Sequence, residues 1–419
     1  MKKLLTVEHS LTAAFVAETI CVTYALLFPA LIPAASILYC ICGLMIAGLI
    51  LFLPQAKQSF SIKENAHHLS TLSFRIVAVI IMAIELFHFC KKWIEDAPMN
   101  YHDADMLPIM KIMSQRFLSG HFSQVYNIIP EIWNGIHPVY LPAMWMPFNI
   151  AVAGNFDLRW ITTICLMLIF TIFIFVFHPS HQKKVSPFIL LCAFLFFWWI
   201  STSETQGIVP YTEEGIVIFY YMLLTLALLN GNIWFIAVCI ALCGLSRYAF
   251  IGWLIPYGLI LVYKKRVPDL IKLIATGIVC FLLLMIIPFG WAPFINLLSL
   301  PDRYIDFATR VWHDSPIVFS SSLGFAKFFG AGRIALQHHL LIILSFAVPF
   351  LFAVIAIWLR DKKNYRIRNI SLATFKISLV VFYSFIDVPY LYLFYTSSFV
   401  SLLIVGYFIS LREEEMIIQ

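Results

Sequence analysis

The chain has 419 residues, of which 62% are hydrophobic and only 12% are charged, and its formal net charge at pH 7 is +6. Soluble domains are about half apolar, so this composition and a mean hydropathy of +0.90 exclude a soluble globular protein. The sequence contains no basic soluble domain and no basic–aromatic groove, which excludes a nucleic-acid partner.

Apolar segments long enough to cross a bilayer core recur from one end of the chain to the other. We predict an all-α polytopic membrane protein with about twelve transmembrane helices, each spanning a hydrocarbon core of about 30 Å. One membrane domain, residues 1–419, contains all of them. The predicted spans lie near residues 10–28, 32–53, 73–90, 159–178, 187–202, 214–230, 232–247, 249–263, 270–289, 338–359, 370–386 and 391–410.

Lysine and arginine residues alternate between the short connections and so indicate the topology. The basic groups are Lys2 and Lys3, Lys57 and Lys63, Lys183 and Lys184, Lys264 to Arg266, and "RDKKNYRIR" at 360–368. By the positive-inside rule these connections are cytoplasmic, and both termini lie on the same side. Two long connections, near residues 91–158 and 290–337, then face outward.

The first outer loop opens with "NYHDADML", which places His102 beside Asp103 and Asp105. The following stretch, "MLPIMKIMSQRFLSGH", has a stripe of methionines and ends at a glycine, so it predicts an amphipathic helix in the membrane interface. Asp105 falls at the N-cap of this helix, where the helix dipole favours an ionised carboxylate. The pair of aspartates therefore either caps the helix or forms part of a site.

Residues 138–154 are apolar but short, and they contain Pro142 and Pro147. If they crossed the membrane, the later alternation of basic residues would invert. We therefore predict a second interfacial or re-entrant segment, which is tolerated where protein covers the backbone.

These features resemble the GT-C superfamily of polytopic glycosyltransferases, which use polyprenyl-phosphate sugars. "DAD", the helix ending in "FLSGH", "VY" and "HPVYLP" are most similar to the protein-mannosyltransferase-like and bacterial lipid-sugar branches. The resemblance continues in "YTEEGIVIFYYMLLTLALL" and "CGLSRYAFIGWLIPY", and it covers roughly residues 75–290. The first hairpin is an addition to the usual start of the family.

The resemblance implies three regions and an activity. Residues 1–72 form an N-terminal hairpin and a cytoplasmic loop, residues 73–290 a GT-C-like catalytic module, and residues 291–419 the C-terminal helices. The implied enzyme is an inverting glycosyltransferase that moves a hexose or pentose from a polyprenyl-phosphate donor. Its acceptor is a hydroxyl of a lipid-linked glycan, a glycolipid or a protein. It acts in cell-envelope glycan biosynthesis, on the periplasmic side of a bacterial inner membrane.

The expected site residues follow from the needs of this reaction. A carboxylate must accept the acceptor's proton, and Asp103 and Asp105 are the candidate catalytic residues. We prefer Asp103 as the base because Asp105 is expected to cap the helix, and the other aspartate is expected to orient the acceptor or bind a divalent ion. Cations must bind the donor phosphate. The candidates for that role are Arg247, Arg303, Arg310 and Lys327. The candidates for substrate binding are His102, His137, Tyr140, Glu213, Glu214 and His313. No cofactor is assigned; a divalent cation, Mg²⁺ or Mn²⁺, is left open.

Simpler interpretations stay open for several of these residues. Glu213 and Glu214 are also placed to cap the following helix, and Arg247 to extend its side chain toward the membrane interface. A secondary transporter is the alternative function of a different class, and a lipid-linked glycan polymerase or ligase is a second alternative. Internal symmetry and polar residues deep within the spans would favour a transporter. Glu18 lies within a span, and the sequence indicates no partner for it.

Overall fold

The structure is a computed structural model that describes residues 2–24, 29–53, 69–176, 195, 208–298, 300–363 and 366–410. Within these ranges every regular element is a helix. Six helical stretches are long and apolar enough to cross a membrane: Pro29–Ile50, Leu72–Asp96, Arg159–Val176, Val267–Phe289, Ala331–Leu359 and Leu391–Ile409. The chain is thus all-α, and its long apolar helices are those of a multi-pass membrane protein.

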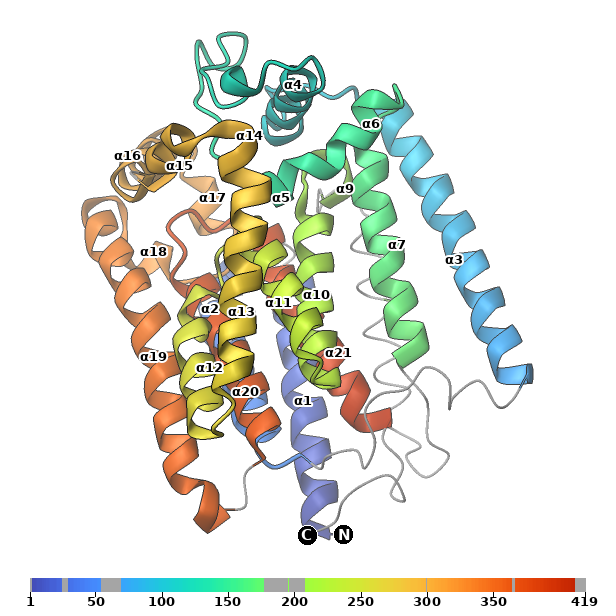
Figure 1. Ribbon diagram of the computed structural model, residues 1–419, viewed down its shortest axis with the longest axis vertical. Helices are drawn as coiled ribbons and strands as arrows, with labels where there is room; N and C mark the ends of the chain where they lie inside the picture. Colours follow the sequence, from blue (N-terminus) through green and yellow to red (C-terminus); the bar gives the residue numbers. More distant parts are fainter. Residues whose placement is uncertain are drawn as a thin grey trace.

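The longer helices run side by side along the long axis of the molecule (Figure 1). They are α1 (Lys2–Tyr24), α2 (Ile32–Ile50), α3 (Leu69–Asp96), α7 (Arg159–Val176), α10 (Glu214–Asn230), α11 (Ile233–Gly244), α12 (Ile251–Tyr263), α13 (Val267–Phe281), α19 (Ile334–Lys363), α20 (Ile367–Phe385) and α21 (Phe394–Ser410). A π-helical turn, Leu282–Ile286, joins α13 to α14 (Ile287–Phe289).

Shorter helices connect these long ones, and several gather at one end of the bundle. They are α4 (Met106–Leu118), α5 (Pro142–Trp145), α6 (Asn149–Ala153), α9 (Ile208–Tyr211), α15 (Trp291–Leu298), α16 (Leu300–Asp314), α17 (Ile317–Ser320) and α18 (Ala326–Phe329). Figure 1 shows α4, α6, α15 and α16 together at the upper end. The two long connections expected on one side of a membrane therefore lie at the same end of the molecule.

The predicted spans coincide with helices wherever the structure describes them, but not all of these helices are long. Residues 187–202 fall almost entirely outside the described residues. Helices α10, α11 and α12 are apolar but have only 10–17 residues, shorter than a full crossing. The helix predicted after Asp105 is confirmed as α4, and α5 and α6 pack against it. Its location in the membrane interface stays a prediction.

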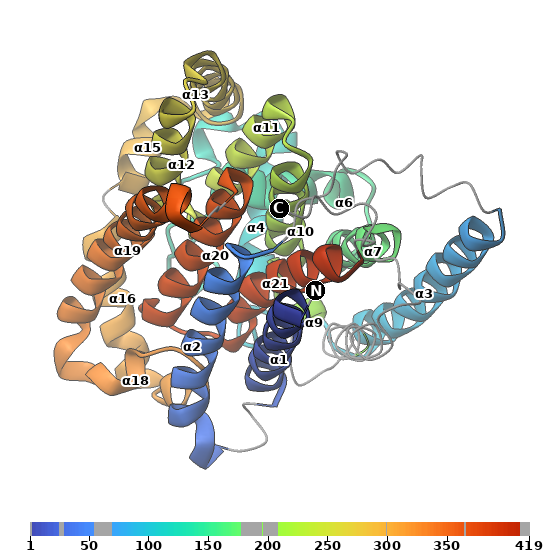
Figure 2. The ribbon, with the colours of Figure 1, turned by 90° about the horizontal axis from the view of Figure 1, so that it is seen from below.

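Helix α21 forms the centre of the bundle and is almost wholly buried. It contacts α1, α7, α10 and α20, and Figure 2 shows it among these helices. Farther out, α12 and α19 come very close at Gly252, where a Cβ atom would fall 1.7 Å from the carbonyl oxygen of Ser345. Only glycine fits at that crossing.

A fully buried ion pair joins α1 to this centre. The Nζ atom of Lys376 lies 2.7 Å from Oε1 of Glu18, and both side chains are 0% exposed. Lys376 also donates to the hydroxyl of Ser397 at 2.7 Å, and the Ser401 hydroxyl donates to Oε2 of Glu18 at 2.8 Å. Glu18 therefore has a partner that the sequence did not indicate.

Arg159 closes the outer loop of residues 97–158 at its base. Its guanidinium donates to the carbonyl oxygens of Trp93 at 3.2 Å, Ala97 at 2.6 Å and Ile94 at 3.3 Å. Trp93 and Ile94 lie in the last turn of α3 and Ala97 directly follows it, where backbone carbonyl groups have few partners within the helix. The Trp93 carbonyl also accepts the backbone N–H of Ala97 at 3.1 Å. Arg159 also binds Asp157 at 2.8 Å. Burial alone would raise the pKa of Asp157, but the hydrogen bonds and charge of Arg159 lower it.

Replacing Lys376 with Met should destabilise the bundle because Glu18 would stay buried without a cation. Breaking a buried pair in this way costs about 3–5 kcal/mol. Changing Glu18 to Gln as well should restore much of the loss, since no unpaired charge then remains. Thermal unfolding of the detergent-solubilised variants measures both effects. A Lys376→Met protein that unfolds at the wild-type temperature would contradict the assigned role of the pair.

Candidate functional site

An arginine between two glutamates lies at the start of α10. Nη2 of Arg247, in the connection from α11 to α12, lies 3.1 Å from Oε1 of Glu213, and its Nη1 atom binds Oε2 of Glu214. The glutamate side chains are 1% and 0% exposed. Buried carboxylates need such a partner because the low-dielectric interior penalises an isolated charge.

The glutamates do not cap α10 with their side chains. Glu213 occupies the N-cap position without a side-chain capping bond, and the hydroxyl of Thr212 accepts the backbone N–H of Glu214 at 3.2 Å instead. From the other side, the Thr396 hydroxyl of α21 donates to Oε1 of Glu214. The capping interpretation of Glu213 and Glu214 is therefore wrong, and their carboxylates belong to a cluster between helices.

Asp105, at the start of α4, is a further partly buried carboxylate. It occupies the N-cap position of the helix, but its side chain forms no capping hydrogen bond; its Oδ2 atom accepts one from Nε1 of Trp133 at 3.2 Å. Burial raises the pKa of Asp105, and the hydrogen bond from Trp133 opposes that rise. The charge of Asp105 raises the pKa of Glu213 and of Tyr140 in addition to the larger effect of their burial.

Asp103 lies in the turn before α4, where its backbone N–H bonds to the carbonyl oxygen of Asn100 at 3.3 Å, and it is exposed to solvent. We expected Asp105 to be occupied as a helix cap and Asp103 to be free for chemistry. The expected cap was wrong, because the side chain of Asp105 forms no capping hydrogen bond and accepts one from Trp133 instead. The choice between the two aspartates as the base stays a prediction.

Tyrosines surround the carboxylates. Burial raises the pKa of Tyr140 and Tyr304, with a contribution from Glu213 in both cases, so their hydroxyl groups stay protonated at neutral pH. Tyr390 also lies near Asp105, whose charge adds to the effect of burial on its pKa. Neutral hydroxyl groups both donate and accept hydrogen bonds, as polyhydroxylated ligands require.

His338 and Asp387 adjoin the site, and sequence reasoning did not identify them. Nδ1 of His338 on α19 lies 2.6 Å from Oδ2 of Asp387, in the turn after α20. The charge of Asp387 also raises the pKa of Tyr304, after burial, while Arg247 lowers it. An aspartate in "FIDVP", between two apolar segments, was the available signal, but it fell in a connection we considered only as a short link.

Two buried carboxylate oxygens in this region accept no hydrogen bond from the residues that the structure describes. They are Oε2 of Glu213 and Oδ1 of Asp387. Buried polar atoms normally have a partner in the protein or in ordered water. Both oxygens are thus available to accept hydrogen bonds from water or from the hydroxyl groups of a ligand.

The structure does not assemble the cations expected to bind a donor phosphate. Arg247 is paired with both glutamates. Lys327 donates to the hydroxyl of Ser36 at 3.0 Å and to the Ser322 carbonyl, and burial lowers its pKa to about 8. Lys327 therefore joins α18 to α2 instead of reaching the carboxylates.

The remaining predicted residues lie nearer the surface. Arg310 on α16 is exposed, and the side chain of Arg303 is outside the described part of the chain. His313 is exposed and binds the adjacent Asp314 at 2.9 Å. His137 is exposed as well, whereas the ring of His102 packs against two aromatic neighbours of Asp105.

Across the described ranges, no group of three or more histidine, cysteine, aspartate or glutamate side chains is arranged to hold a metal ion. No family model, curated protein or solved structure matches the chain. The local geometry contains three acidic side chains and one guanidinium, with tyrosine hydroxyl groups around them. Such a site suits a neutral ligand with many hydroxyl groups better than a free anion.

Replacing Arg247 with Gln should destabilise the protein because two buried carboxylates would face each other without a cation. The double variant Arg247→Gln/Glu214→Gln should recover part of that loss. Thermal unfolding of the purified variants measures both. Wild-type stability of Arg247→Gln, together with a raised requirement for a phosphate-bearing donor, would show that Arg247 acts on the ligand and not on the glutamates.

Proposed function

We propose that the chain is a GT-C-like inverting glycosyltransferase with about twelve spans, a number that includes the shorter apolar helices. It transfers a sugar from a polyprenyl-phosphate donor to an acceptor hydroxyl. One observation carries the proposal: the amphipathic helix α4 carries the partly buried Asp105 at one end of an apolar bundle, where its charge raises the pKa of the buried Glu213 in addition to the effect of burial. A lipid-anchored donor presents its sugar at that depth.

In this mechanism Asp105 is the general base. The acceptor oxygen attacks the anomeric carbon as its proton passes to Asp105, and the bond from that carbon to the phosphate oxygen breaks. The products are the new glycoside and polyprenyl phosphate, with inversion at the anomeric carbon. The raised pKa of Asp105 helps, because a more basic carboxylate takes a proton more readily.

The other residues bind and orient the substrates. Tyr140, Tyr304 and the free oxygen of Glu213 are placed to bind the sugar hydroxyl groups. Arg247 fixes Glu213 and Glu214 and presents one partly exposed edge. We assign the leaving phosphate to that edge.

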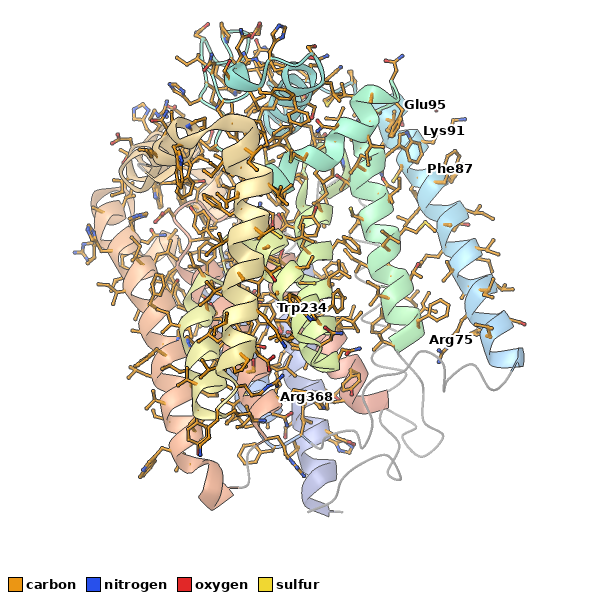
Figure 3. The ribbon with its side chains drawn as sticks, viewed as in Figure 1. Arg75, Phe87, Lys91, Glu95, Trp234 and Arg368 are labelled. Carbon is orange, nitrogen blue, oxygen red and sulfur yellow. The ribbon has the colours of Figure 1, made fainter. Side chains whose placement is uncertain are left out.

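The proposed orientation places the site on the periplasmic side of a bacterial inner membrane, with both termini cytoplasmic. Its support is the separation of charge along the bundle. Lys264 and Arg266 follow α12 at the end opposite α4 (Figure 1). In Figure 3, Arg75 and Arg368 likewise lie toward that end, whereas Glu95 lies near the end that carries α4 and α6.

A secondary transporter is the second candidate, and the buried pair of Glu18 and Lys376 is the observation that favours it. Ionisable residues within spans often mark an ion or proton pathway. The pair, however, is closed by serine hydroxyl groups and is 0% exposed. Among the described residues, the buried carboxylate oxygens that accept no hydrogen bond, Oε2 of Glu213 and Oδ1 of Asp387, lie in the other cluster.

Asp105→Asn should lower turnover by about 10²–10⁴-fold, the usual contribution of a general base, without loss of folding. Asp103→Asn is the matched control and should transfer sugar at close to the wild-type rate. Transfer from a panel of polyprenyl-phosphate sugars by protein in nanodiscs provides the measurement. Because the base must be ionised, the wild-type rate should fall as the pH is lowered through the raised pKa of Asp105. Loss of activity in Asp103→Asn alone would reverse the two roles.

Single cysteines at Ser123 and Lys264 should react with a membrane-impermeant thiol reagent from opposite sides of the membrane. Both positions are exposed, and they lie at opposite ends of the bundle. In intact cells only the cysteine at position 123 should be labelled, and the one at 264 should react after the membrane is opened. Labelling of both cysteines in intact cells would contradict the proposed topology.

A further inference from the structure

An exposed aromatic cluster adjoins the candidate base. Trp133 is 52% exposed, and its ring lies 5.6 Å from that of Tyr101 and 5.6 Å from that of His102, nearly perpendicular to each. The rings of Tyr101 and His102 lie 4.1 Å apart. Oδ2 of Asp105 accepts the indole N–H at 3.2 Å.

The backbone that carries Trp133 is in an unfavourable conformation. Trp133 has φ +50° and Asn134 has φ +57°, both in the left-handed region that bulky residues rarely adopt. Such strain persists only where the surroundings hold it, and it is concentrated at functional sites. Here a two-way backbone pairing between Ile129 and Ile136 closes the turn at 2.9 and 3.2 Å.

A side chain of α4, Arg116, also holds the loop that carries Trp133. The guanidinium of Arg116 donates to the carbonyl oxygens of Gln124 at 3.0 Å, Asn127 at 2.8 Å and Ile128 at 3.0 Å. Arg116 and Asp105 are on the same helix element, so the loop and the candidate base are positioned together. Trp133 is therefore both exposed and rigidly oriented.

This arrangement differs from that of a tryptophan that anchors a protein in a membrane. An anchoring tryptophan directs its N–H toward headgroups and water. The N–H of Trp133 instead binds Asp105, which fixes the ring plane relative to the candidate base. A flat, polarisable surface held beside a carboxylate suits a ligand with one apolar face and hydroxyl groups at its edge.

We propose that the acceptor is a carbohydrate whose pyranose ring packs on the indole of Trp133 and presents its attacking hydroxyl to Asp105. The C–H groups on one face of a pyranose are weakly positive and are attracted to the negative face of an aromatic ring. The hydroxyl groups at the edge of the same ring reach Asp105. The inference rests on the proposed function for the role of Asp105, and it narrows the acceptor from a glycan, lipid or protein to a glycan.

A quaternary ammonium group is the competing ligand for aromatic rings beside a carboxylate. Such a cation is bound within a cage whose rings face a shared space. The rings of Tyr101, His102 and Trp133 instead pack on one another at 4.1–5.6 Å, so the space between them is filled. A face of the cluster, and not its interior, is left for a ligand.

Binding is tested without the reaction, by ¹⁹F NMR of the full chain labelled with 5-fluorotryptophan in nanodiscs. The signal missing from Trp133→Phe identifies Trp133. Methyl glycosides of mannose, glucose and galactose are the probes, and sorbitol and choline are the controls. We expect a saturable shift of the Trp133 signal with at least one glycoside and none with sorbitol. A shift with choline alone, or with no probe, overturns the proposal.

Two variants of Trp133 distinguish its stacking on the sugar from its positioning of Asp105. Trp133→Phe keeps an aromatic face without the N–H, and Trp133→Leu removes both; all three residues meet the same backbone strain. We expect KM for a glycan acceptor to rise by up to about tenfold in Trp133→Leu and to rise less in Trp133→Phe, since the loss of stacking on an aromatic ring corresponds to about 2–13-fold in affinity. Trp234→Leu, another exposed tryptophan remote from Asp105 (Figure 3), should leave KM unchanged.

The acid limb of the pH profile should move up in both Trp133 variants, because the N–H bond that lowers the pKa of Asp105 is lost in each. Equal KM in Trp133→Leu and wild type overturns the stacking role. If glycosides shift the Trp133 signal but the protein transfers no sugar, the proposed enzymatic activity is wrong and the carbohydrate-binding site remains. If the protein transfers sugar to a lipid or protein acceptor and no glycoside shifts the Trp133 signal, only the proposed carbohydrate-binding site is wrong.

Discussion

The site depends on a single positive charge placed between two buried carboxylates. Arg247 pairs with both Glu213 and Glu214, whose side chains are almost completely buried, and Glu214 in turn accepts a hydrogen bond from Thr396 of α21. The start of α10, the connection before α12 and the first turn of α21 are thereby held in one arrangement. Removal of the cation would leave like charges in a low dielectric, where they repel most strongly.

Helix α21 links this centre to the rest of the bundle. Thr396 contacts Glu214, and the next residue, Ser397, contacts Lys376, which binds Glu18 of α1. Consecutive residues of a helix point in directions about 100° apart, so one turn of α21 reaches two different charge clusters. The N-terminal hairpin is therefore connected to the site through two adjacent positions on a single helix.

Local sequence patterns predicted the parts of this structure that depend on local physics. The methionine stripe after Asp105 specified an amphipathic helix, and α4 has those bounds. The choice between Asp103 and Asp105 was not local, because Trp133, 28 residues farther along, folds back onto Asp105. The partner of Glu18 is 358 residues away, and apolar periodicity contains no information about that pairing. The sequence around α10, α11 and α12 is continuously apolar, so it did not indicate that these helices are short.

The closure of α3 by Arg159 has a consequence for how the protein is made. The last carbonyl groups of α3 are satisfied by a residue 62–66 positions later in the chain. When α3 leaves the ribosome, that residue has not yet been synthesised, and the helix end must remain in contact with water or headgroups. The outer loop can reach its final form only after α7 has been inserted. Assembly of the site is therefore a late event in biogenesis, which follows the insertion of the first spans instead of accompanying it.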